Sequence, residues 1–82
     1  MPPTSHPIKR ALQMMDGWLD LPEREYRATV YLFAQRLPAD EVLEAVEIAQ
    51  AKLPQGGMDA FKYFCGVCHG KIRERKIQLA WN

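Results

Sequence analysis

A Leu-Pro pair recurs along this chain at a constant interval. The pairs are Leu21-Pro22, Leu37-Pro38 and Leu53-Pro54, each sixteen residues after the one before. Proline disfavours the α conformation at the residue that precedes it, but its own fixed φ suits the first turn of a helix. The pairs therefore predict breaks between helices. The segments between them do not repeat one another in sequence, so a solenoid is not expected.

Apolar residues recur at helical spacing between these breaks. The expected helices run from Pro7 to about Leu19, from Pro22 to about Leu37, from Pro38 or Ala39 to about Lys52, and from Met58 or Asp59 to about Gln78. We expect Thr4 or Ser5 to cap the first helix. No segment has the alternating pattern of a strand. The sequence therefore predicts an all-α fold, a small compact bundle of about four antiparallel helices.

The core of this bundle is expected to draw on every helix. The second helix is the most apolar and is predicted to form the centre, with Tyr31 and Leu32 widening its buried stripe. Gly66 and Gly70 lie inside the last helix, where each costs about 1 kcal/mol relative to alanine. We therefore expect another helix to approach them closely. The predicted core residues are Leu12, Phe33, Val46, Phe61, Phe64 and Ile72.

The length of 82 residues predicts a single domain, residues 1–82. No apolar run approaches the roughly 18 residues that a membrane span requires. The first residues lack the apolar region of a signal peptide. We therefore expect a cytoplasmic protein without a membrane segment, in which thiols stay reduced. The sequence leaves a monomer or a homodimer open.

Cys65, Cys68 and His69 form the C-x-x-C-H pattern of a c-type haem attachment site. Gly57 and Phe61 lie eight and four residues before Cys65, so the segment resembles the start of a typical cytochrome c. The resemblance implies thioether bonds from both cysteines and iron ligation by His69. No export signal is present, however, and no methionine follows His69. A haem electron-transfer protein is therefore retained only as an alternative.

A zinc site is a further alternative for the same three residues, with His6 as a fourth ligand. No second closely spaced pair of ligands accompanies them, and no thioredoxin-like strand precedes the two cysteines. Cys65 and Cys68 also share a helical face with Phe61 and Ile72. We therefore expect both cysteines to be small buried apolar residues, and we expect no cofactor.

Charge is distributed unevenly, although the net charge is only +1. Residues 38–61 contain one lysine and five carboxylates, a net of −4, whereas residues 62–82 contain five basic residues and one glutamate, a net of +4. The basic end favours contact with nucleic-acid phosphates, with an aromatic residue for stacking. The residues predicted to bind are Lys62, Lys71, Arg73, Arg75, Lys76 and Trp81. The alternative is that the third and fourth helices are antiparallel neighbours with complementary charges.

Residues 40–50, 61–68 and 71–74 resemble the C-terminal region of DnaD-type primosome proteins in layout. In that family of phage and plasmid replication proteins, an alanine-rich amphipathic helix is followed by an aromatic-rich helix with a basic end. The resemblance reaches the aromatic Phe61 and Tyr63 and the basic residues around Lys71. It implies DNA binding, or docking on a partner, during the initiation of replication.

The leading hypothesis is a non-enzymatic binding module from a phage, plasmid or other mobile element. It would act on nucleic acid or on the replication and transcription machinery. The chain has no nucleophile motif and no phosphate-binding glycine loop, so an enzyme is not expected. The second hypothesis is a small inhibitor or adaptor that docks on another protein through an acidic helix. The acidic residues are Asp40, Glu41, Glu44 and Glu47.

Overall fold

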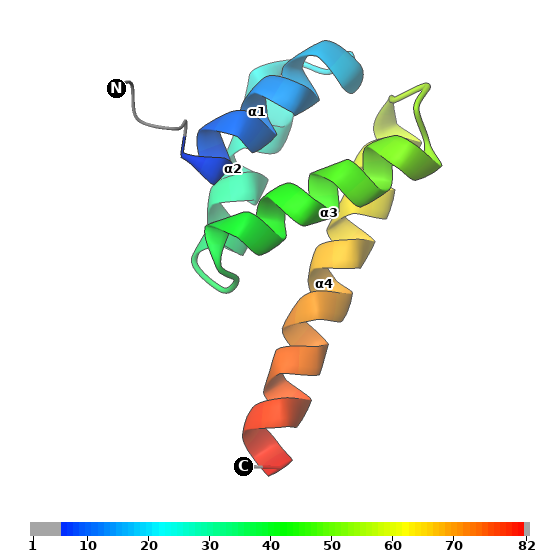
Figure 1. The fold of residues 1–82 in the computed structure, drawn as a ribbon. Coiled ribbons are helices and arrows are strands. Elements are labelled where there is room, and N and C mark those ends of the chain that lie inside the picture. The colour runs from blue at the N-terminus through cyan, green and yellow to red at the C-terminus, as the bar shows by residue number, and fades with distance from the viewer. Residues whose placement is uncertain (1–5, 82) are drawn as a thin grey trace, which may run out of the picture.

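The computed structural model describes the backbone of residues 6–81 and the side chains of residues 6–76. Four α-helices follow one another: α1 (Pro7–Trp18), α2 (Glu23–Ala34), α3 (Ala39–Lys52) and α4 (Met58–Trp81). Residues 6–81 contain no strand, and consecutive helices run in opposite directions (Figure 1). The predicted all-α bundle of four helices is therefore confirmed. Within the same residues, no helix combines the length and the apolar composition that a membrane span needs.

The Leu-Pro pairs lie at helix boundaries, as predicted, but they act in two ways. Pro22 and Pro38 are the residues directly before α2 and α3, and their ψ angles of 139° and 147° give the extended backbone of an N-cap. Pro54 instead follows the end of α3 and opens the turn that leads to α4. Two of the three prolines therefore start helices, and the third lies in the loop that reverses the chain.

The cap of α1 differs from the prediction. The helix begins at Pro7 as expected, but the Nδ1 atom of His6 accepts a hydrogen bond from the backbone N–H of Ile8 (3.1 Å). This bond satisfies one of the N–H groups that the first turn of a helix leaves without a partner. Thr4 and Ser5, to which this role was assigned, lie outside the described residues.

The centre of the fold is α3, which packs against both α1 and α4 (Figure 1). The prediction that α2 forms the centre is wrong, because Tyr31 and Leu32 are exposed and α2 ends at Ala34 instead of continuing to about Leu37. The buried residues of α2 are Tyr26, Val30 and Phe33, and the helix packs against α1 and α3, with Phe33 also contacting α4. The buried apolar residues are Ile8, Ala11, Met15, Trp18, Leu19, Tyr26, Val30, Phe33, Leu37, Val42, Ala45, Val46, Ala49, Ala60, Phe64 and Cys68.

Half of the predicted core residues are buried. Phe33, Val46 and Phe64 are buried, whereas Leu12, Phe61 and Ile72 are only partly buried and pack against the core. Leu12 lines a groove between α1 and α2, and Ile72 lines a groove between α2 and α4. These two residues are only partly buried because α2 does not pack against its neighbours along its whole length.

The loop between α3 and α4 is fastened to the end of α1. Trp18 donates a hydrogen bond from Nε1 to the carbonyl oxygen of Leu53 (2.8 Å), and the N–H of Gly57 donates to the carbonyl oxygen of Leu19 (3.0 Å). Gly56 has a φ of +72°, and a Cβ atom added there would overlap the carbonyl group of Trp18. Only glycine fits this position, because it lacks a Cβ atom and tolerates a positive φ. The loop thereby fixes where α4 begins.

Gly66 and Gly70 do not mark a close contact between helices. Both are exposed, and a Cβ atom added to either would meet nothing within 4 Å among the described residues. The prediction that another helix approaches them is therefore wrong. α4 packs against the core through buried residues such as Phe64 and Cys68, and its C-terminal part extends beyond the other three helices (Figure 1).

Candidate binding surface

Two ion pairs join the basic part of α4 to the acidic helix α3. The Nζ atom of Lys71 lies 2.8 Å from Oε1 of Glu44, and Nη1 of Arg75 lies 3.1 Å from Oε2 of Glu41. The hydrogen bond to Glu44 raises the pKa of Lys71 above its ordinary value, although partial burial acts in the opposite direction. The alternative of complementary charges on antiparallel helices is thus confirmed for two of the predicted nucleic-acid contacts.

The other two cations of this part of α4 line a groove between α2 and α4. Arg73 and Lys76 are exposed, and they share the groove with Arg36, which follows the end of α2. Among the described residues, no carboxylate oxygen lies within 4.0 Å of the charged nitrogen atoms of these three side chains. The groove measures about 850 Å³ and is lined by Thr29, Leu32, Phe33, Arg36, His69, Ile72, Arg73 and Lys76. We call it the basic groove.

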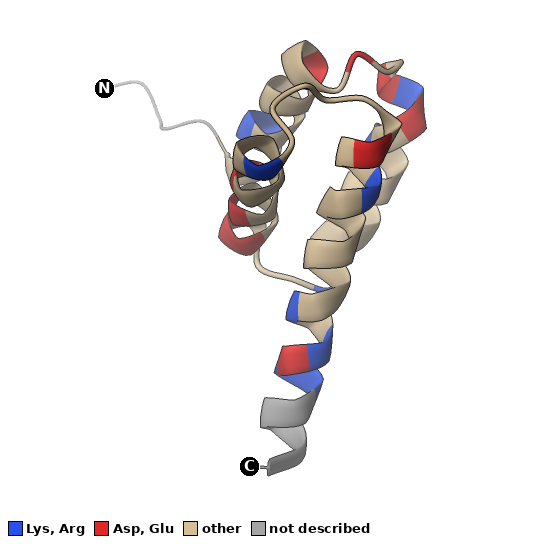
Figure 2. Cartoon of the chain, turned by 90° about the vertical axis from the view of Figure 1, so that its right-hand side faces the viewer, with Lys and Arg blue, Asp and Glu red and all other residues tan. Residues whose placement is uncertain are grey.

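Helical periodicity explains why α4 presents its cations in two directions. Lys71 and Arg75 are four residues apart, so they lie on one side of α4, the side of the buried Cys68 that faces α3. Arg73 and Lys76 are three residues apart and lie on another side. Figure 2 shows the basic residues following one another along the lower part of α4. One run of basic sequence therefore supplies both ion pairs with α3 and the wall of the basic groove.

Two residues of the basic groove were missed by sequence reasoning. Arg36 is held near α4 by the turn that closes α2, in which its own N–H donates to the carbonyl oxygen of Phe33 (3.0 Å). Nothing in the sequence places it near Arg73. Leu32 was expected in the core, but it is 59% exposed, the largest exposed fraction among the large apolar side chains that are described. Its exposure follows from the incomplete coverage of α2.

Cys65, Cys68 and His69 do not form a converging set of ligands. Cys68 is fully buried, and burial is the main reason that its pKa is raised to about 12; burial likewise raises the pKa of the half-buried Cys65. The ring of His69 packs edge-on against Phe33, with 5.2 Å between the ring centroids. Within the described residues, no group of three His, Cys, Asp or Glu side chains is arranged to hold a metal ion. Both thiols therefore remain protonated at neutral pH, and the cysteines pack as apolar residues.

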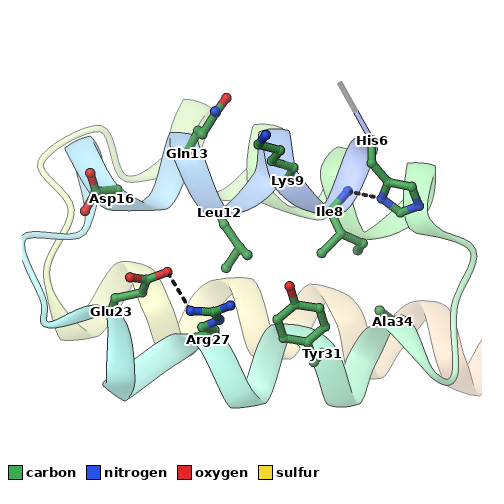
Figure 3. Close-up of a pocket in the computed structure, with 10 residues that line it drawn as sticks. All are labelled: His6, Ile8, Lys9, Leu12, Gln13, Asp16, Glu23, Arg27, Tyr31 and Ala34. Atoms are coloured by element: carbon green, nitrogen blue, oxygen red, sulfur yellow. Dashed lines mark hydrogen bonds and ion pairs between the residues drawn. The ribbon is translucent and has the colours of Figure 1, made fainter. Parts of the chain in front are cut away.

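A second groove, between α1 and α2, has a different character (Figure 3). It measures about 700 Å³, and Leu12 and Tyr31 reach into it from the two helices. Its charges are of both signs: Arg27 lies 3.6 Å from Glu23, and its guanidinium group lies 5.8 Å from the centroid of the Tyr31 ring. The remaining lining residues are His6, Ile8, Lys9, Gln13, Asp16 and Ala34. Because its charges balance, this groove does not favour a ligand of one charge.

The remaining predicted residues are dispersed. Lys62 is exposed on α4 but does not line the basic groove, and the side chain of Trp81 lies outside the described residues. On the acidic helix, Asp40 and Glu47 are exposed, whereas Glu41 and Glu44 are engaged by the cations of α4. Two of the four carboxylates predicted to dock on a protein partner are therefore engaged by cations of α4.

Comparison with known proteins gives no match: no family model fits the chain, and no curated protein or solved structure is significantly similar to it. The likeness to DnaD-type proteins stays a prediction. The features of the structure that bear on its function are the two grooves and the charges that line them.

Proposed function

We propose that this chain is a non-catalytic binding module whose basic groove contacts the phosphate backbone of a nucleic acid. The observation that carries the proposal is the convergence of Arg36, Arg73 and Lys76 on a groove with no carboxylate in its lining. A phosphate oxygen is the natural partner of such cations, and two of the three are arginines, which bind phosphate through two parallel hydrogen bonds.

The expected binding is weak and depends strongly on salt. Each phosphate that a cation neutralises releases condensed counterions, so three contacts give a slope of about −2 to −2.7 in a plot of log affinity against log salt concentration. A fourfold rise in salt should then weaken binding by about 15- to 40-fold. This salt dependence separates phosphate contacts from apolar association.

The basic residues proposed to contact nucleic acid are fewer than those predicted from the sequence. Lys71 and Arg75 contribute less than Arg73 and Lys76 because carboxylates of α3 already engage them. Lys62 stays outside the site, and Arg36 joins it. The resemblance to DnaD-type proteins is the reason for placing such a module in DNA replication in the cytoplasm, and that setting is part of the proposal.

The test is a titration of a fluorescently labelled oligonucleotide, followed by anisotropy at low and at raised salt. Replacing Arg36, Arg73 or Lys76 by glutamine should weaken binding and lower the salt slope by about 1 for each cation. Lys62→Gln is the matched control, because it removes one exposed charge of the same helix outside the groove. Equal losses for Lys62→Gln and Arg73→Gln, or no binding at low salt, would overturn the proposal.

A further inference from the structure

We infer that the basic groove also seats one unpaired nucleobase, so that the module prefers single-stranded nucleic acid to a duplex. This inference rests on the proposed function and specifies the form of nucleic acid that the same groove takes. It is carried by the apolar side chains that line the groove together with the cations, which a phosphate contact alone does not require.

The first observation is the apolar lining. Leu32, Phe33 and Ile72 line the groove together with the three cations, and Leu32 is 59% exposed. Large apolar side chains that are exposed inside a concave site gain free energy when a ligand covers them. A ligand that fits this groove therefore combines negative charge with a flat or apolar body.

The second observation is the fixed orientation of the His69 ring. It packs at 82° against Phe33, and Phe33 packs in turn at 84° against the buried Phe64, with 5.8 Å between their ring centroids. This row of three rings connects the exposed histidine to the core, so its ring is held in place before a ligand arrives. Aromatic side chains, histidine among them, are the usual platforms on which unpaired bases stack.

A single strand matches this lining better than a duplex does. Every nucleotide of a single strand brings one phosphate and one base that can leave its neighbours and enter a pocket. The bases of a duplex are stacked and paired, so they offer only their edges, and the Leu32 side chain would stay in contact with water. Stacking of a base on His69 should favour the single strand by roughly 5- to 150-fold, the range for one base stacked on an aromatic residue.

The decisive probes are three oligonucleotides of equal length and charge per strand, measured under one low-salt condition. One is an unstructured pyrimidine strand, one is a blunt duplex, and one is a single strand with several abasic sites. The pyrimidine strand should bind at least about fivefold tighter than either of the others. The abasic strand separates the effect of a base from the effect of strand flexibility, because it keeps its phosphates.

The matched variants are Leu32→Gln and Ile48→Gln. Each replaces an exposed aliphatic residue by an amide of similar size, and only Leu32 lies in the groove; Ile48 is 39% exposed on α3. Leu32→Gln should weaken binding of the pyrimidine strand about fivefold more than binding of the duplex, because the base covers less apolar surface, and it should leave the salt slope unchanged because the cations remain. Ile48→Gln should change neither. An upfield shift of the His69 ring protons on binding the pyrimidine strand would give a second readout of stacking.

The outcomes distinguish this inference from the proposed function. Equal affinity for all three oligonucleotides, or an unchanged preference in Leu32→Gln, would show that no base binds in the groove. The proposed phosphate contacts would not be affected by that result. Absence of binding to every oligonucleotide at low salt overturns both. A peptide of alternating acidic and apolar residues that binds more tightly than the pyrimidine strand, and loses affinity in Leu32→Gln, would assign the groove to a protein partner and overturn both as well.

Discussion

Lys71 of α4 and Glu44 of α3 form an ion pair, with 2.8 Å between Nζ and Oε1. The lysine side chain is only 16% exposed, whereas the glutamate side chain is 58% exposed. A second pair, Arg75 with Glu41, lies one helical turn away on the same two helices. The two pairs join the basic part of α4 to the acidic helix α3 in a chain whose net charge is +1.

The Lys71–Glu44 pair should stabilise the fold only modestly. Because Glu44 is largely exposed, solvent screens the attraction, and a double-mutant cycle with Lys71→Gln and Glu44→Gln should give a coupling free energy of about 0.5 kcal/mol. The measurement is urea unfolding of the four proteins at neutral pH. A coupling near zero would mean that the pair makes no net contribution to the position of α4 on α3.

The loop that fastens α4 to α1 should be much more sensitive to substitution. Gly56→Ala introduces a Cβ atom that overlaps the carbonyl group of Trp18 and also strains a backbone with a φ of +72°. We expect a loss of more than about 2 kcal/mol in the free energy of unfolding, since αL strain alone costs about 1–2 kcal/mol.

Gly57→Ala is the matched control for this loop. Its φ is +87°, but a Cβ atom added there would meet nothing within 4 Å of the described residues. Only the backbone strain of about 1–2 kcal/mol should then appear. If both variants lose the same stability in thermal unfolding, the contact between Gly56 and Trp18 does not hold the loop in solution.

The sequence predicted much of this fold because helical periodicity and Leu-Pro breaks are local signals. Val42, Val46 and Ala49, for example, are buried on one face of α3, and helical spacing alone assigns them to that face. Leu32 has the same apolar character, and its exposure depends on how far α2 is covered by its neighbours. No local sequence pattern indicates how much of α2 is covered by the neighbouring helices.

The composition of the candidate site was predictable only in part. The basic end of α4 was visible in the sequence, and the separation of Lys71 from Arg73 follows once the buried face of the helix is known. Arg36 enters the groove through the tertiary arrangement of α2 and α4, across more than thirty residues of sequence. The cap of α1 by His6 was missed because serine and threonine are the commoner capping residues.

The two interior glycines of α4 should be replaceable with a gain in stability. Gly66 and Gly70 are exposed, and an added Cβ atom meets no described neighbour, so only the helix propensity of the residue changes. Gly66→Ala and Gly70→Ala should each raise the free energy of unfolding by about 0.5–1 kcal/mol. Chemical denaturation measures this gain. A loss of stability in either variant would restore the idea that a helix packs closely against this side of α4.

Alkaline pH should destabilise the protein through its buried thiol. The pKa of Cys68 is raised from 9.0 to about 12, chiefly because burial disfavours the thiolate, with the nearby Cys65 thiol adding to the shift. Between about pH 9 and pH 12 the unfolded chain therefore releases a proton that the folded chain retains. Stability is unaffected by this group below pH 9 and falls as the pH rises through that window.

Cys68→Ala should make this decline shallower. The variant removes the titrating group but also loses some packing, so the informative quantity is the slope of the unfolding midpoint against pH and not its absolute value. The slope should decrease without vanishing, because the pKa values of Cys65, Tyr26 and Lys71 are also raised and act in the same direction. An identical slope in the two proteins between pH 9 and pH 11 would show that the Cys68 thiol ionises in the folded state as readily as in the unfolded chain.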